Sequence, residues 1–209
     1  MGDGVQKLAF DTVDASEAPT LVANAVSWMI AQGYIGEAQK EFEWSDDLSH
    51  PPGPNWRDIV DDARRWRGLI NTRDLNLTPP PGARPYDMAQ FLETRPNGVK
   101  ASAERMVCDA GENWTGFEFG ICPACDQEVG LDAQVNDCCA PWFEGEACTL
   151  TCPSCGAVSR LEDWDLQPFW AFSNAALLFW NWPALSEAFV RNLADALGGL
   201  RVRHIVGKY

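Results

Sequence analysis

Two short cysteine motifs place the strongest constraint on how this chain of 209 residues can fold. The segment ICPACD carries Cys122 and Cys125, and TCPSCG carries Cys152 and Cys155. Two cysteines separated by two residues reach a single ion when the chain turns tightly between them, and such a turn leaves backbone N–H groups free to point at the thiolates. Proline fixes φ within each turn, and Gly156 permits the left-handed residue that completes the second turn. The spacing therefore predicts that the four cysteines bind one zinc ion, Zn²⁺.

Four thiolates complete the tetrahedral coordination that zinc prefers, which leaves no position for a catalytic water. A thioredoxin-like redox site is the main alternative, but that chemistry needs one Cys-X-X-Cys motif that opens a helix after a core strand. Strand-like residues precede both motifs here, at 117–121 and 147–151. The cysteines are therefore interpreted as a structural zinc site that contributes folding energy rather than catalysis.

The two motifs resemble the zinc ribbon family over about residues 115–165, a family in which two knuckles at the tips of β-hairpins share one metal ion. The resemblance implies a small β module with Cys122, Cys125, Cys152 and Cys155 as ligands. Two features depart from the family pattern. Asp126 stands where the second motif has Gly156, and 26 residues separate the motifs, against about 15–20 in the usual pattern. The longer separation leaves the hairpin topology open.

Four further cysteines lie outside the two motifs, at positions 108, 138, 139 and 148. The N-terminal segment MGDGVQKLAF has no apolar stretch long enough for a signal peptide, so the cysteines point to metal rather than disulfides and to a cytoplasmic location. Cys138, Cys139 and Cys148 could each replace a knuckle ligand or belong to a second site. We expect instead that all four are free thiols that act as small hydrophobic side chains.

The negative charge of the chain is concentrated around the cysteines. The net charge is −14. Residues 106–190 contribute −12 of it, with Arg160 as the one base against 13 acids, whereas residues 1–105 contribute −5 and residues 191–209 contribute +3. An acidic field repels phosphate backbones and anionic membranes and attracts basic proteins. We therefore expect a basic protein partner, no nucleic acid and no membrane.

The remaining patterns predict an α+β fold with N-terminal helices, a small four-cysteine zinc-ribbon β module and a C-terminal strand–helix–strand unit. The expected domains are residues 1–105, residues 106–165, and residues 166–209 packed with the first region as one domain. Helical patterns begin at Ser16, at Asn55 and near Pro183. Weaker patterns predict a strand at 68–77, a short helix at 87–93, strands and loops through 104–160, and a last strand at 200–209.

One segment is free of charge over residues 166–186, which is long enough to cross a bilayer. Gln167, Pro168, Asn174 and Asn181 interrupt it, and such residues are poorly satisfied in lipid. We expect buried strands instead. The tryptophans in and beside this segment are expected to fill the core, with an aromatic binding surface as the functional alternative; they are Trp164, Trp170, Trp180 and Trp182.

No familiar catalytic motif is present in the sequence. The two histidines, His50 and His204, are interpreted as structural, and His204 is expected to share a strand face with Val202 and Val206. Neither nominates an active site.

The most consistent function is therefore a zinc-binding, non-catalytic protein-interaction module of bacterial type, comparable to an inhibitor, an immunity protein or an adaptor. One alternative is an enzyme of unknown class with the ribbon as scaffold and a site in the N-terminal region. Another is a ribbon linked to nucleic acid, which would need a basic face that the sequence lacks. The candidate residues of the enzyme site are Asp46, Asp47, His50, Arg57 and Asp58.

Overall fold

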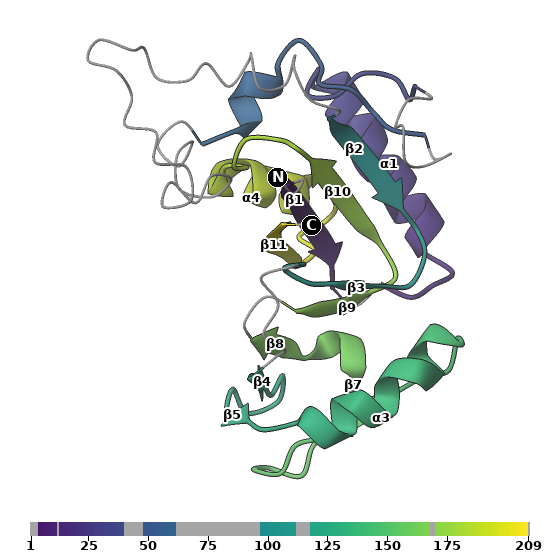
Figure 1. Cartoon of the computed structure of the whole chain (residues 1–209), viewed down its shortest axis with the longest axis vertical. Helices are drawn as coiled ribbons and strands as arrows, with labels where there is room; N and C mark the ends of the chain where they lie inside the picture. The colour runs from purple at the N-terminus through teal and green to yellow at the C-terminus, as the bar shows by residue number, and fades with distance from the viewer. Residues whose placement is uncertain are drawn as a thin grey trace, which may run out of the picture.

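The computed structural model of the chain describes residues 4–11, 13–39, 48–61, 97–111, 118–167 and 170–208. Over these ranges three α-helices combine with many short antiparallel strands in several small sheets, so the predicted α+β class is confirmed. Figure 1 shows a larger sheet with two helices at one end of the long axis and a smaller part with one helix at the other. The strand expected at 68–77 and the helix expected at 87–93 lie outside the described residues.

A four-stranded antiparallel sheet organises the larger part, in the order β11-β1-β10-β2. Its strands are β1 (Gly4–Phe10), β2 (Gly98–Ser102), β10 (Ala176–Trp180) and β11 (Val202–Lys208). Strand β1 lies between β10 and β11 and is buried at every residue. Because both neighbours run antiparallel to β1, they run parallel to each other, and α4 connects them. The predicted C-terminal strand–helix–strand unit is confirmed, with β1 inserted between its two strands.

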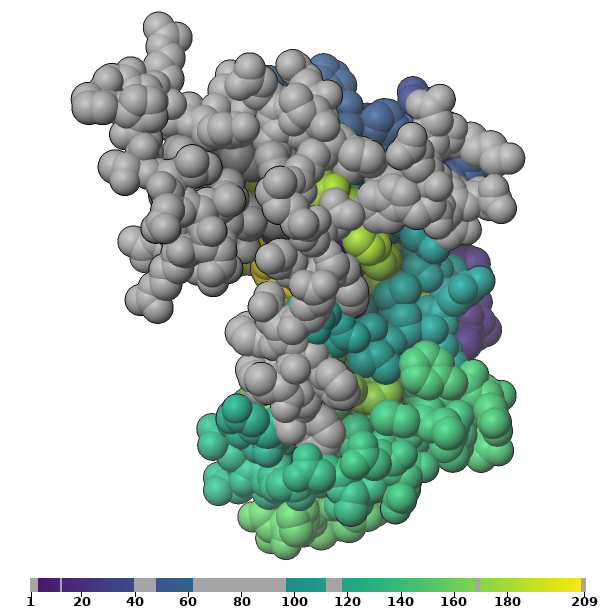
Figure 2. Space-filling view, viewed as in Figure 1, coloured from purple at the N-terminus to yellow at the C-terminus, as the bar shows by residue number. Residues whose placement is uncertain are grey.

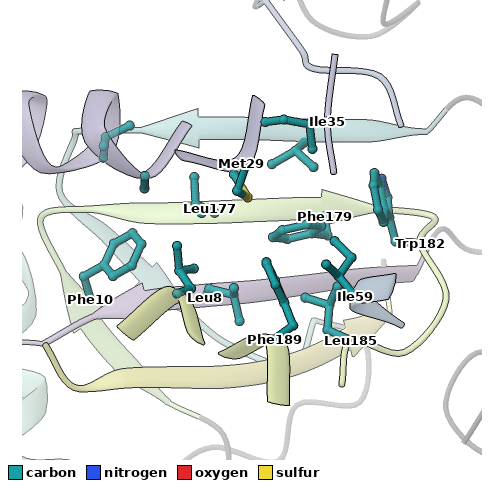
Figure 3. Close-up of a cluster of buried hydrophobic side chains, with 14 of the residues drawn as sticks. Leu8, Phe10, Met29, Ile35, Ile59, Leu177, Phe179, Trp182, Leu185 and Phe189 are labelled. Carbon is teal, nitrogen blue, oxygen red and sulfur yellow. The ribbon is translucent and has the colours of Figure 1, made fainter. Parts of the chain in front are cut away.

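Helices α1 (Ala18–Ala31) and α4 (Glu187–Ala196) pack on one face of this sheet (Figure 1). Figure 3 shows the apolar side chains between the layers, where Phe179 of the sheet lies close to Phe189 of α4. Their ring centroids are 6.0 Å apart in an edge-to-face arrangement, which stabilises an aromatic pair beyond its buried area. This core draws on residues from both ends of the sequence.

Two predicted helix starts are displaced in the structure, and a third begins a 3₁₀ turn instead of an α-helix. The α1 helix starts at Ala18 rather than Ser16, and α4 starts after Ser186, whose hydroxyl accepts a hydrogen bond from the Phe189 N–H at 3.1 Å. Asn55 precedes only a 3₁₀ turn, η1 (Trp56–Ile59). Val60 is then extended and bridges to Leu185, and the rest of the predicted helix, from residue 62 on, lies outside the described residues.

The opposite face of the sheet carries a second strand pair, β3 (Met106–Cys108) with β9 (Ala171–Ser173). The charge-free segment thus forms strands β8 (Asp165–Gln167), β9 and β10, as expected of buried strands. No helix among the described residues combines the length and apolar character needed to cross a membrane. Trp164 and Trp182 are fully buried in the core, and Trp170 and Trp180 are half-buried.

The smaller part, here named the cysteine module, comprises residues 118–167 and has its own apolar core. Its first half contains β4 (Phe119–Ile121), β5 (Glu128–Val129) and α3 (Asp132–Phe143). Its second half contains β6 (Thr149–Thr151), β7 (Val158–Arg160), the 3₁₀ turn η2 (Leu161–Asp163) and β8.

Helix α3 was not predicted, since strands and loops were expected through residues 104–160. The residues that it buries are Val135, Cys138 and Trp142, which recur at spacings of three and four. This spacing is the feature of the sequence that indicates a helix here. The helix runs along the outer side of the cysteine module (Figure 1).

Arginine side chains join the cysteine module to the large sheet. The Arg203 Nε donates to the Asp11 carboxylate at 2.8 Å, and Nη1 of the same side chain donates to the Trp164 carbonyl. The Arg201 guanidinium lies 3.0 Å from the Asp165 carboxylate. In the space-filling view the green residues of the module abut the teal residues near β2 and β3, so the two parts are in contact (Figure 2).

Candidate metal centre

Each cysteine motif lies in the turn of an antiparallel hairpin. Strands β4 and β5 flank the first motif, with Ile121 opposite Glu128. Strands β6 and β7 flank the second, with Thr151 opposite Val158. The 26 residues between the motifs had left it open whether each motif lies in a hairpin. Both do, and the residues between the motifs form α3.

The two turns have the same backbone hydrogen bonds, although their sequences differ. The N–H of the first cysteine donates to the carbonyl five residues later, at 3.0 Å for Cys122 and 2.9 Å for Cys152. The residue after the second cysteine has a positive φ in both turns, 56° at Asp126 and 76° at Gly156. Aspartate is one of the few residues besides glycine that adopts this left-handed conformation readily, so the departure at Asp126 leaves the turn intact.

The two turns bring the four knuckle cysteines, Cys122, Cys125, Cys152 and Cys155, to one point. All four sulfur atoms lie within 4.8 Å of one another, with Cys122–Cys155 and Cys125–Cys152 Sγ separations of 3.9 Å. Sulfur atoms held about 2.3 Å from a zinc ion at tetrahedral angles lie about 3.8 Å apart. The donor set and its spacing therefore fit a single tetrahedral zinc ion.

Backbone donors and neighbouring thiols change the proton affinity within this cluster. Burial raises the pKa of Cys152. The N–H groups of Cys155 and Ser154 and the adjacent thiols lower it by more than burial raises it, so that the pKa is about 7. The Gln127 N–H lowers the pKa of Cys125, whereas desolvation and the other three thiols raise it to about 12. Adjacent thiolates repel each other, and a divalent cation among them removes that repulsion.

The centre is buried on one side and open on the other. Cys122 and Cys152 have exposed fractions of 0% and 1%, whereas Cys125 is half-buried and Cys155 is exposed. The Ala124 N–H lies 3.4 Å from the Cys122 sulfur, as expected where a turn directs N–H groups at thiolates. With four sulfur donors the coordination is complete, so the arrangement suits a structural ion.

The cysteines outside the knuckles do not join this cluster. Cys138 and Cys148 form a disulfide, with Cα atoms 5.7 Å apart. The expectation that these two are free thiols, and that the cysteines serve metal rather than disulfides, is wrong for this pair. Cys108 and Cys139 are free, and burial raises the pKa of the Cys108 thiol to about 12. Both therefore behave as the small hydrophobic side chains that were expected.

Acidic side chains cover the outside of the cysteine module. Arg160, the one base in this segment of the sequence, forms ion pairs with Asp14 at 2.6 Å and Asp163 at 3.4 Å. Its charge is thus locally balanced. The exposed acids of the module are here named the acidic surface; they are Glu118, Asp126, Glu128, Asp132, Asp137, Glu144 and Glu146.

The residues proposed for an N-terminal enzyme site make separate contacts where they are described. A ring nitrogen of His50 lies 2.9 Å from the Gly36 carbonyl. Arg57 stacks over the Trp56 ring at 4.6 Å, and Asp58 is exposed. Asp46 and Asp47 lie outside the described residues. No shared site is evident among the three described members.

His204 occupies the position expected of it on the last strand. It alternates with Val202 and Val206 along β11, and its Nε2 lies 3.1 Å from the Gln6 side-chain oxygen. Gln6 is itself buried and hydrogen-bonds the backbone of the loop before α4. His204 thus contacts Gln6, the side chain that holds this loop in place.

Comparisons of the chain with protein-family models, curated proteins and solved structures find no match. The function is therefore inferred from the residues of this chain alone.

Proposed function

We propose that this chain is a non-catalytic protein-interaction module in which one structural zinc ion supports an acidic surface that binds a basic protein. In this proposal the zinc is held by Cys122, Cys125, Cys152 and Cys155 in two ribbon-like knuckles. The partner is bound by the surface around the metal rather than by the metal. An inhibitor, an immunity protein and an adaptor all fit this description.

The observation that carries the proposal is the convergence of four sulfur atoms from two hairpin turns. The module that contains them has only short strands, and β4, β5, β6 and β7 have three residues or fewer. Strands of this length are marginal without a further constraint. A bound ion supplies that constraint, because the free energy of binding the metal becomes free energy of folding.

The distribution of charge supports a basic partner. Four bound thiolates and one zinc ion carry a formal charge of −2, which adds to the acidic surface around them. Exposed Phe143 and Val158, with exposed fractions of 55% and 63%, lie in the same module. Apolar side chains within a charged rim are typical of protein interfaces.

Metal analysis of the purified chain tests the zinc site. We expect about one zinc ion per chain, and we expect Cys152→Ser to lose most of it, because a hydroxyl is a poor replacement for a thiolate at neutral pH. Cys139→Ser is the matched control and should retain the full zinc content. A folded wild-type chain without zinc, or one with a disulfide across either knuckle, would contradict the zinc site.

Charge reversal tests the acidic surface. Asp132→Lys with Asp137→Lys should weaken binding of a captured partner by about tenfold or more, since both exposed acids lie on α3. Glu17→Lys with Glu37→Lys changes the net charge equally at exposed positions far from the module in sequence. This control should bind as wild type does. A partner whose affinity is insensitive to both salt and the α3 reversal would refute electrostatic capture.

A further inference from the structure

Helix α3 is attached to strand β6 at two successive positions on one helix face. The Gln134 side-chain amide accepts from the Thr151 N–H at 2.8 Å and donates to the Thr151 carbonyl at 3.0 Å. One turn later, Cys138 is joined by its disulfide to Cys148, just before β6. Gln134 therefore occupies the outer edge of β6 as a paired strand would, and the disulfide fixes the helix beside it.

This attachment leads directly to the candidate metal centre. Thr151, whose N–H and carbonyl both hydrogen-bond the Gln134 side chain, is followed by the knuckle residue Cys152. At its other end α3 is fixed independently, because the Trp142 indole donates to Glu162 at 2.8 Å. The disulfide is thus the covalent part of a connection between the module core and the second knuckle.

We propose that the Cys138–Cys148 disulfide regulates how long the zinc ion is retained, so that the reduced protein releases zinc faster than the oxidised protein. The proposal rests on the zinc site proposed above and adds its regulation. Release of zinc requires the second knuckle to move away from the first. The second knuckle follows β6, so this movement pulls β6 away from α3. An intact disulfide restricts that separation, and a reduced one does not.

The redox step is an exchange with a dithiol reductant. Cys148 is half-buried, whereas Cys138 is 6% exposed, so the attacking thiolate reaches the Cys148 sulfur and displaces Cys138 as a thiolate. The second thiol of the reductant resolves the mixed disulfide. The reductant leaves as a disulfide, having supplied two electrons, and Cys138 and Cys148 end as protonated thiols.

Coupling of this kind is reciprocal. If the disulfide slows zinc loss by strengthening zinc binding, then zinc must stabilise the disulfide by the same factor. The zinc-loaded protein should therefore be harder to reduce than the metal-free protein. Gln134 is a positioning residue in this arrangement, since it acts on the metal through Thr151.

The test measures zinc transfer from the full chain to a chromogenic chelator present in excess. The samples are the oxidised wild type, the dithiol-reduced wild type after anaerobic removal of the dithiol, and the Cys138→Ser/Cys148→Ser double variant. We expect the two proteins without the disulfide to release zinc on the order of tenfold faster than the oxidised wild type. Cys139→Ser, which keeps the disulfide beside the substituted position, should release zinc at the oxidised wild-type rate.

A second variant tests the attachment without changing the redox state. Gln134→Met retains side-chain length but removes both hydrogen bonds to Thr151, so it should release zinc faster with the disulfide intact. Its Thr151 amide should also exchange hydrogen faster. These two results support the attachment of β6 as the origin of the coupling.

The outcomes separate the two proposals. A folded chain without zinc overturns the zinc site and the regulation together. One zinc per chain with equal release rates from oxidised, reduced and double-variant proteins overturns the regulation alone. Peptide mapping that finds Cys138 and Cys148 as free thiols in protein purified without reductant also overturns the regulation alone.

Discussion

At the scale of single residues, two of the knuckle thiols, Cys125 and Cys152, differ in how readily they ionise. Cys152 has a pKa of about 7, because burial destabilises its thiolate less than backbone N–H groups and the neighbouring thiols together stabilise it. Cys125 has a pKa of about 12, because its neighbours and desolvation outweigh the N–H of Gln127. Near neutral pH, Cys152 is therefore available to an incoming ion as a thiolate, whereas Cys125 must lose its proton as the ion binds.

This difference predicts how zinc affinity depends on pH. Protons compete with zinc for thiolates, so affinity should rise with pH throughout the range in which Cys125 is protonated. Below about pH 7, Cys152 is protonated as well, and the slope of log affinity against pH should increase by about one. Competition titration with a chelator of known pH dependence, from pH 6 to pH 8.5, measures the slope. A slope that is unchanged across pH 7 would contradict the assignment of Cys152.

At the scale of elements, the hairpins of the cysteine module pack tightly on the start of α3. Gly120 in β4 has no room for a side chain, since an added Cβ would lie 2.6 Å from a methyl carbon of Leu131 and 3.2 Å from Trp164. Leu131 immediately precedes α3, and Trp164 belongs to the module core. The first knuckle, α3 and the aromatic segment thus meet at this glycine.

Gly120→Val should destabilise the module, because overpacking a filled core costs about 1–3 kcal/mol. Gly130→Ala is the control, since an added Cβ there meets no atom within 4 Å. Chemical denaturation of the zinc-loaded proteins, followed by tryptophan fluorescence, measures both effects. Gly120→Val with wild-type stability would show that the contact is not as close as described.

An element could be predicted when the residues that specify it lie close together in the sequence. The knuckles were predicted because Cys-Pro-X-Cys specifies a turn and a ligand set within a few residues. Helix α3 was missed because only three of its 12 residues are buried, in a segment expected to form strands and loops. The Cys138–Cys148 pairing could not be read from spacing alone. The Gln134 contact with Thr151 is likewise tertiary, since neither residue carries a distinctive pattern.

At the scale of the whole molecule, a nearly buried arginine on the large sheet connects that sheet to the cysteine module. Arg203 and Asp11 have exposed fractions of 8% and 2%, and Arg203 also donates to the Trp164 carbonyl of the module. Burial acts against the charged form of Asp11 and raises its pKa, while the charge of Arg203 and the hydrogen bond from it lower the pKa. Asp11 thus orients the arginine whose other hydrogen bond reaches the cysteine module.

Arg203→Met should destabilise the protein by about 3–5 kcal/mol, because it removes the buried guanidinium that pairs with the buried Asp11 carboxylate. Arg201→Met removes an arginine that is 58% exposed and pairs with the same aspartate at 3.4 Å, so it should cost less than about 1 kcal/mol. Denaturant unfolding gives both values. If the Arg201 change proved as costly as the Arg203 change, burial would not be the reason for the effect.

The position of β1 in the sheet has a consequence for synthesis on the ribosome. Both neighbours of β1, strands β10 and β11, follow the entire cysteine module in the sequence. During translation β1 must therefore wait for its partners, whereas all four knuckle cysteines have already been made. Contacts between residues far apart in sequence also form slowly. With the zinc site proposed above, the nascent chain holds every ligand for the ion before the last two strands of the large sheet have been made.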